Sequence, residues 1–124
     1  NPSFKTLQDK VTRAARKGYL KGIDGRKIFI RSEHAALNSL LQGGGAIIMK
    51  KGLALFDSLI KLNDYDARFV ANIHDEWQME VREDIANNIG QLAVDCIKTA
   101  GNYYNLRCPM DGEYKVGRNW SETH

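Results

Sequence analysis

The chain has 124 residues, 43% of them hydrophobic, which suits one domain with a real core. Eighteen Lys and Arg against fifteen Asp and Glu give a net charge of +3, a mild basic balance compatible with nucleic acid but not diagnostic of it. No apolar run approaches the ~20 residues of a membrane span, and two cysteines without metal-ligand spacing argue against a disulfide scaffold. These features predict a cytoplasmic protein with reduced thiols and no membrane partner.

The first thirty residues predict a helix followed by a hairpin. Apolar residues recur at helical spacing from Phe4 to Ala15, with Ser3 as the candidate N-cap and Gly18 as the stop. Residues 19–21 and 27–30 read as two short strands around the turn signal Asp24-Gly25.

Residues 33–62 predict one long helix with Ser32 as its N-cap and an apolar stripe of leucines and isoleucines. Three consecutive glycines, residues 43–45, interrupt it, and each costs roughly 1 kcal/mol relative to Ala inside a helix. Two explanations stand equal. Either the helix breaks into two shorter helices at the glycines, or something approaches this backbone so closely that a Cβ would collide.

His34, Asn38 and Gln42 recur every four residues on this predicted helix and would stack on one face. All three donate hydrogen bonds without carrying a fixed charge, whereas a solvated helix face usually carries Glu and Lys. Hydrogen-bond acceptors occur on every base pair in the minor groove of DNA, so such donors would check base-pair geometry without reading sequence. Alone, the row is a weak signal, and a plain polar surface is the commoner explanation.

The stretch 68–81, RFVANIHDEWQMEV, predicts two strands around His74, Asp75 and Glu76. Gly, Asn or Pro would be the usual turn residues, so two carboxylates and an imidazole there suggest a chemical role. An amphipathic helix follows, with Ile89 and Cys96 on its apolar face and Gly101 as its stop, and a last strand is expected near residues 113–116. The order of elements predicts an α+β fold with an antiparallel sheet packed on long helices.

The motifs HAALNSLLQGGGA and IHDEWQMEV, in that order and at that spacing, resemble the C-terminal part of a family A DNA polymerase, and the match is closest to the phage replicative type. The end of the chain, DGEYKVGRNWSETH, resembles the end of such polymerases, so the resemblance covers essentially all 124 residues. It implies that the chain is the C-terminal part of a palm domain, a palm-type antiparallel sheet on long helices. The fingers, the first palm motif and any exonuclease domain would lie outside it.

The resemblance also implies a role for each candidate site residue. Asp75 would be one of two metal-binding aspartates, and Glu76, the accessory acid beside it, would also be a metal-binding residue. His74 would lie near the primer terminus. Asn38 and Gln42 would face the minor groove of primer and template. His34 stands at a position where bacterial members of the family usually have Arg and phage-type members have His. Arg31 would contact a backbone phosphate. Two Mg²⁺ ions on carboxylates would activate the 3′-hydroxyl and stabilise the leaving pyrophosphate.

The implied partners are primer–template DNA, deoxynucleoside triphosphates and the upstream part of the same polymerase, in the host cytoplasm if a phage encodes it. The second essential aspartate belongs to an earlier motif that these 124 residues lack, so we expect the isolated chain to be inactive. Two alternatives remain. One is a non-catalytic DNA-binding module. The other is a metal-dependent hydrolase built on residues 74–76, although adjacent strand residues point to opposite faces and rarely bind one ion.

Overall fold

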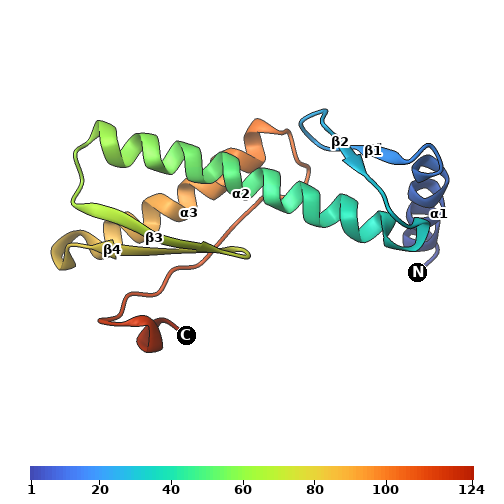
Figure 1. Ribbon diagram of the computed structural model, residues 1–124. Helices are drawn as coiled ribbons and strands as arrows, with labels where there is room; N and C mark the ends of the chain where they lie inside the picture. Colours follow the sequence, from blue (N-terminus) through green and yellow to red (C-terminus); the bar gives the residue numbers. More distant parts are fainter. The chain divides into compact units, whose positions relative to one another are not determined.

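The computed structural model of the protein describes residues 1–124, which form two compact units, residues 1–47 and 48–124. In chain order the elements are α1 (Pro2–Ala15), β1 (Tyr19–Lys21), β2 (Lys27–Phe29), α2 (Ala36–Leu62), β3 (Ala67–Ile73), β4 (Glu76–Val81) and α3 (Ala86–Tyr103) (Figure 1). Helices and two separate two-stranded antiparallel sheets confirm the predicted α+β class. No helix is both long and apolar enough to cross a lipid bilayer.

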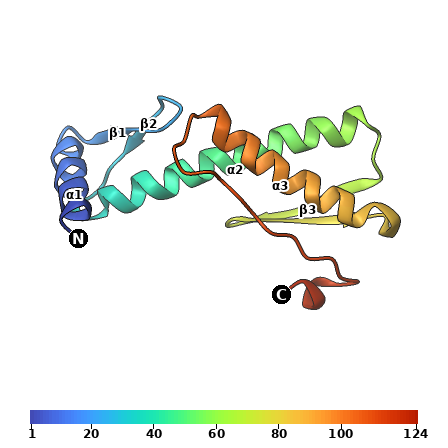
Figure 2. The same ribbon diagram turned by 180° about the vertical axis from the view of Figure 1, so that it is seen from behind.

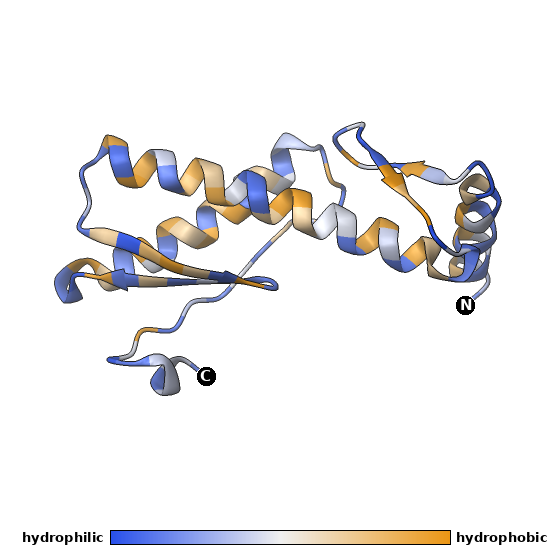
Figure 3. Ribbon diagram, in the orientation of Figure 1, coloured by the Kyte–Doolittle hydropathy of each residue, from blue (hydrophilic) through white to orange (hydrophobic).

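In the first unit, α1 packs its apolar side on the hairpin and on the start of α2. The buried residues of this small core are Val11, Ala15, Leu20 and Ala36. Hydrophobic and hydrophilic residues alternate around the turns of α1 and α3, as amphipathic helices require (Figure 3). The predicted cap is wrong by two residues. The Oδ1 atom of Asn1, and not the Ser3 side chain, accepts the first free N–H, that of Ser3, at 2.9 Å.

The hairpin of the first unit pairs Tyr19 with Phe29, Leu20 with Ile28, and Lys21 with Lys27. Its connection contains Gly25 at φ +85°, a left-handed conformation that glycine adopts without steric cost. The predicted strands and the Asp24-Gly25 turn are therefore confirmed, apart from one residue at the end of the second strand.

α2 runs without interruption through the glycine triplet, so of the two alternatives the break at residues 43–45 does not occur. It begins at Ala36, after a 3₁₀ turn over Glu33–Ala35, and not at residue 33. Ser32 occupies the N-cap position of that turn, but its side chain makes no capping hydrogen bond. A Cβ atom added to Gly43 would meet the end of the Ile28 side chain at 2.9 Å, whereas Gly44 and Gly45 face open space.

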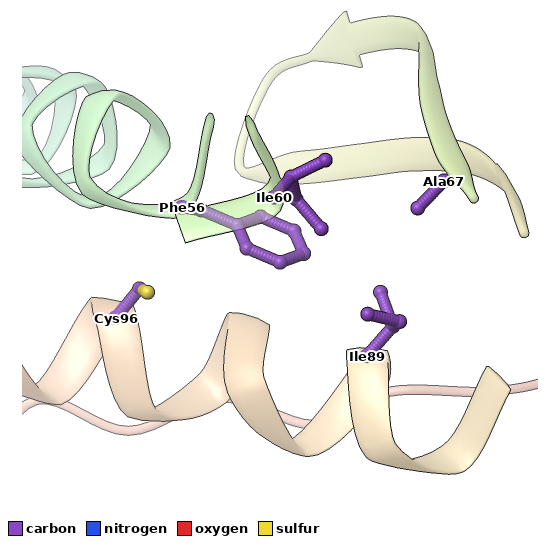
Figure 4. Close-up of a cluster of buried hydrophobic side chains, with 5 residues drawn as sticks. All are labelled: Phe56, Ile60, Ala67, Ile89 and Cys96. Carbon is purple, nitrogen blue, oxygen red and sulfur yellow. The ribbon is translucent and has the colours of Figure 1, made fainter. Parts of the chain in front are cut away.

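In the second unit, the C-terminal half of α2 lies beside α3, and the β3–β4 hairpin packs against both (Figures 1 and 2). The buried residues of this core are Phe56, Ile60, Ala67, Ile89 and Cys96 (Figure 4). Phe56 is fully buried, and its ring stacks on Trp77 at 5.7 Å and meets the edge of Phe69 at 5.5 Å. Trp77 and Met79 thus share the core side of β4, as the alternation predicts.

α3 continues to Tyr103 and does not stop at Gly101, which is buried within it. A Cβ on Gly101 would come within 2.6 Å of Met110, and one on Gly90 would overlap the Tyr114 ring. These glycines therefore let the C-terminal segment lie directly on the helix, running antiparallel to it. The strand predicted near residues 113–116 is wrong, because this segment is extended but pairs with no other strand.

Candidate functional site at the β3–β4 turn

The β3–β4 hairpin closes through a two-residue turn made of His74 and Asp75. Ile73 and Glu76 form the last pair of the ladder, so the turn is held by hydrogen-bonded strands on both sides. His74 has φ +54°, a left-handed conformation that is uncommon for a residue with a Cβ. A backbone strained in this way is often found at functional sites, where the surrounding structure holds it in place.

Asp75 and Glu76 have different surroundings although they are adjacent. The Asp75 side chain is exposed, and no hydrogen bond or ion pair occupies its carboxylate. The Glu76 carboxylate, in contrast, is held from two sides. Its oxygens lie 2.9 and 3.2 Å from Nε2 of His124, and Oε1 also accepts a hydrogen bond from Nε2 of Gln78. Asp75 is therefore free to bind a cation, whereas Glu76 is held in a fixed position.

His124 is the site residue that the sequence patterns did not single out. Its ring stacks on Trp120 with centroids 4.4 Å apart, and its Nδ1 atom lies 3.1 Å from the Trp120 carbonyl oxygen. A 3₁₀ turn over Trp120–Thr123, capped by the Asn119 side chain, positions the two rings. The only sequence signal was the chain-end pattern, because the contact with Glu76 spans 48 positions and no local spacing reveals it.

An open groove of about 660 Å³ lies within the second unit, beside β4. Its lining includes Asp75, Glu76 and His124, the core side of β4, one side of α3 and the extended residues 111–117. Trp77 also lines it, and its Nε1 atom is buried without a hydrogen-bond partner. A buried donor left unpaired costs about 1–3 kcal/mol, so this side chain lowers the stability of the second unit.

The residues present fit a divalent cation in part. An exposed, unpaired carboxylate is a suitable oxygen ligand for Mg²⁺. However, the structure has no group of three or more His, Cys, Asp or Glu side chains able to hold a metal ion. His74, Asp75 and Glu76 therefore do not form such a group, although they are adjacent in the chain.

The predicted row of donors lies in the first unit. Asn38 and Gln42 occupy successive turns of α2, and the Gln42 Nε2 atom donates to Asn38 Oδ1 at 3.3 Å. His34 lies in the preceding 3₁₀ turn, so the expected regular stack of three on one α-helix is only partly correct. Arg31 is exposed after β2 and forms no ion pair. All four side chains are accessible to a ligand.

Comparison with known proteins gives a consistent result over almost the whole chain. Residues 4–122 match the model of DNA polymerase family A. The chain is 36% identical to the DNA-directed DNA polymerase of Escherichia phage Phieco32, covering 100% of this chain and 21% of that protein. It is 37% identical to the DNA-directed DNA polymerase of Escherichia phage T7, covering 88% of this chain and 16% of that one. The chain thus spans between 16% and 21% of the length of these relatives.

A solved structure is also similar. It is the POL domain of Pol1 from M. smegmatis in complex with a DNA primer-template and dNTP, and it superposes with a TM-score of 0.70. The sequences are 29% identical, and the match covers 77% of this chain and 19% of that chain.

Proposed function

Since the chain belongs to DNA polymerase family A, we propose that it is the C-terminal part of a polymerase palm domain and that Asp75 is a metal ligand for template-directed nucleotidyl transfer. The observation that carries this proposal is the free carboxylate of Asp75 on a turn held by two paired strands. A rigid turn keeps a ligand oxygen in place, which metal-assisted phosphoryl chemistry demands. DNA replication by a phage-type enzyme is the matching biological role, and the host cytoplasm the matching location.

Each of the three residues at the turn would have its own role. Asp75 would hold Mg²⁺, which when bound would supply charge stabilisation at the α-phosphate and activation of the 3′-hydroxyl. Glu76, held by His124 and Gln78, would keep a second negative charge beside the turn as the accessory acid. The exposed His74 imidazole, next to Asp75, would approach the primer terminus.

The upstream part of the polymerase would complete the site. β4 pairs only with β3, so its other edge has free backbone groups, and Trp77, which lines the groove beside it, has a buried Nε1 atom without a hydrogen-bond partner. An open strand edge favours a further chain segment at this place. The same upstream part would bring the second metal-binding carboxylate, the nucleotide-binding fingers and any exonuclease domain.

The donors of the first unit would contact primer–template DNA. Asn38 and Gln42 are exposed on adjacent turns of α2, and their amide groups suit the acceptors of the minor groove. His34 and Arg31 would extend this contact toward the sugar–phosphate backbone. The glycines next to Gln42 leave room for close approach, since a Cβ on Gly44 or Gly45 would meet nothing within the chain.

Primer extension tests the proposal. In the complete polymerase, Asp75→Asn should lower the extension rate by a factor of about 10³ or more while primer–template affinity changes less than about threefold. Removing a metal ligand without changing side-chain volume isolates the chemistry. The matched control Asp57→Asn alters an exposed carboxylate that pairs with Lys61 and should extend normally. Full extension by Asp75→Asn with retained DNA affinity would leave a non-catalytic DNA-binding module as the function.

The isolated chain provides a second test. Because the proposal assigns the second metal-binding aspartate to the upstream part of the polymerase, the 124 residues alone should not extend a primer with Mg²⁺ and all four nucleotides. Extension by the purified chain, abolished again by Asp75→Asn, would show that these residues hold a complete active site and would overturn the division proposed here.

A further inference from the structure

The charges of the chain are unevenly divided between its two units. Residues 1–47 contain nine Lys and Arg against three Asp and Glu, whereas residues 48–124 contain nine against twelve. The first unit is therefore strongly basic, although the whole chain is only mildly so. An excess of this kind on a small unit favours a polyanionic partner.

Part of this positive charge gathers on the outer face of the β1–β2 hairpin. Leu20 is buried and Ile28 half-buried, so the residues that alternate with them point to the opposite face. Those residues are two directly opposed pairs, Tyr19 with Phe29 and Lys21 with Lys27. One face of the hairpin thus presents two aromatic rings next to two ammonium groups.

The lysines of this face have no internal counterion. Lys21 and Lys27 oppose each other across the ladder, an arrangement of like charges that destabilises a hairpin. The ammonium groups of Lys17 and Lys27 also lie 4.8 and 4.7 Å from the centre of the same Tyr19 ring. No carboxylate comes within 4.0 Å of any of these three ammonium groups, since the ion pairs of this unit are Arg16–Glu33 and Arg26–Asp24.

Phe29 is the second unusual feature of the face. Its side chain is 78% exposed, although strand residues of this size normally pack against something. Neighbouring cations make the face a poor surface for an apolar protein segment. They make it a good surface for a nucleic acid strand, whose bases stack on aromatic rings while its phosphates meet the lysines.

We propose that the outer face of the β1–β2 hairpin binds single-stranded DNA, with a base stacked on Phe29 and phosphates on Lys21 and Lys27. A duplex hides the faces of its bases, so the exposed ring selects an unpaired strand. The choice of DNA rests on the proposed polymerase function, because the unpaired part of the template is then the single strand available to this face. This face is separate from the donors on α2, which suit duplex minor groove.

Fluorescence anisotropy with labelled (dT)12 and the 124-residue chain, without metal or nucleotides, tests the proposal. Phe29→Ser should weaken binding about tenfold or more, since stacking on one aromatic ring is worth about 1–3 kcal/mol. Phe29→Tyr keeps the stacking surface and should bind like the unchanged chain. The matched control is Leu62→Ser, which removes an equally exposed apolar side chain from the second unit and should have no effect.

The lysines are tested by the salt dependence of binding. Lys27→Gln should make the slope of log affinity against log salt shallower by about 0.7, the value expected when one phosphate of a single strand is no longer neutralised by the protein. Lys61→Gln, which removes an exposed lysine already paired with Asp57, should leave the slope unchanged. Circular dichroism confirms that each variant is folded before its affinity is compared.

Four results would overturn the proposal. Phe29→Ser binding as tightly as the unchanged chain would exclude stacking, and an equal loss of affinity of Phe29→Ser for a 12-bp duplex would show that the ring does not select an unpaired strand. Displacement of (dT)12 by a polyglutamate peptide with no dependence on Phe29 would identify an acidic protein segment as the occupant. Loss of the Phe29→Ser effect in the complete polymerase would mean that the upstream chain covers this face. None of these results bears on Asp75, whose role is judged by primer extension alone.

Discussion

Replacing Gly44 and Gly45 with alanine separates the folding cost of the glycine triplet from its function. Both positions lie inside the continuous helix α2, and a Cβ at either one would meet no atom within 4 Å. Glycine is less favourable than alanine by about 0.8–1.0 kcal/mol in a helix interior, so the double variant should be more stable by about 2 kcal/mol. For a chain of this length, each kcal/mol corresponds to about 4 °C in Tm.

Urea and thermal denaturation of the 124-residue chain, followed by circular dichroism, measure this gain. Gly18→Ala is the matched control. A Cβ at Gly18 would also face open space, but the backbone there has φ +91° and is not helical. The same substitution should therefore destabilise the chain by about 1 kcal/mol, since alanine is strained in the left-handed region. A gain at one site and a loss at the other would show that backbone conformation, and not side-chain packing, controls both effects.

The functional half of the prediction uses the complete polymerase. If DNA or another part of the enzyme approaches α2 at the triplet, two added methyl groups should slow primer extension while they stabilise the fold. The reasoning would be refuted by either of two results. An absence of stabilisation would mean that α2 is not helical at the glycines, and unchanged extension by the stabilised variant would mean that nothing approaches them.

Two further predictions concern the second unit. Gly90→Ala places a Cβ against the Tyr114 ring with no room for it, so it should destabilise the chain by about 1–3 kcal/mol in urea denaturation. Adding Tyr114→Ala should restore most of the stability, whereas a neutral Gly90→Ala would show that the C-terminal segment does not lie on α3. Burial, with a smaller contribution from the charge of Asp95, raises the pKa of the Cys96 thiol above its ordinary 9.0. At pH 8 a disulfide reagent should therefore modify the exposed Cys108 at once and the buried Cys96 only on unfolding. Because the pKa of the Cys96 thiol is higher in the folded chain than in the unfolded chain, its contribution to stability is complete below pH 9 and disappears as pH rises through the folded-state pKa. Denaturation of Cys108→Ser at pH 8 and pH 10 checks this loss. Equal labelling rates for the two thiols in the folded chain would contradict the buried position of Cys96.

Local pattern accounted for most of the elements. Helical spacing from Phe4 to Ala15, the Asp24-Gly25 turn and the alternation around residues 74–76 each depend on neighbours along the chain, and the structure has a helix or hairpin at each place. The boundaries were less accurate. Asn1, Ser3 and Ser32 all suit a cap, and which side chain makes the bond depends on where the chain enters the helix.

The glycines show where local pattern stops being sufficient. Gly101 looked like a helix stop and the triplet like a possible break, because glycine is unfavourable in an isolated helix. In the folded chain the helices continue through both. Gly101 lies against Met110, and the triplet lies within a 27-residue helix whose later turns pack on α3 and β4. Burial of those apolar faces outweighs a local penalty of about 1 kcal/mol per residue.

The sequence by itself therefore determined the α+β class, the His74-Asp75 turn and the donors Asn38 and Gln42, because residues close in the chain produce each of them. Only the tertiary structure decided that His124 holds Glu76 while Asp75 stays free, that the C-terminal segment lies on α3, and that lysines without counterions surround Tyr19. The physical reason is that these contacts join residues far apart in the chain or follow from strand register, and no periodicity along the sequence encodes them.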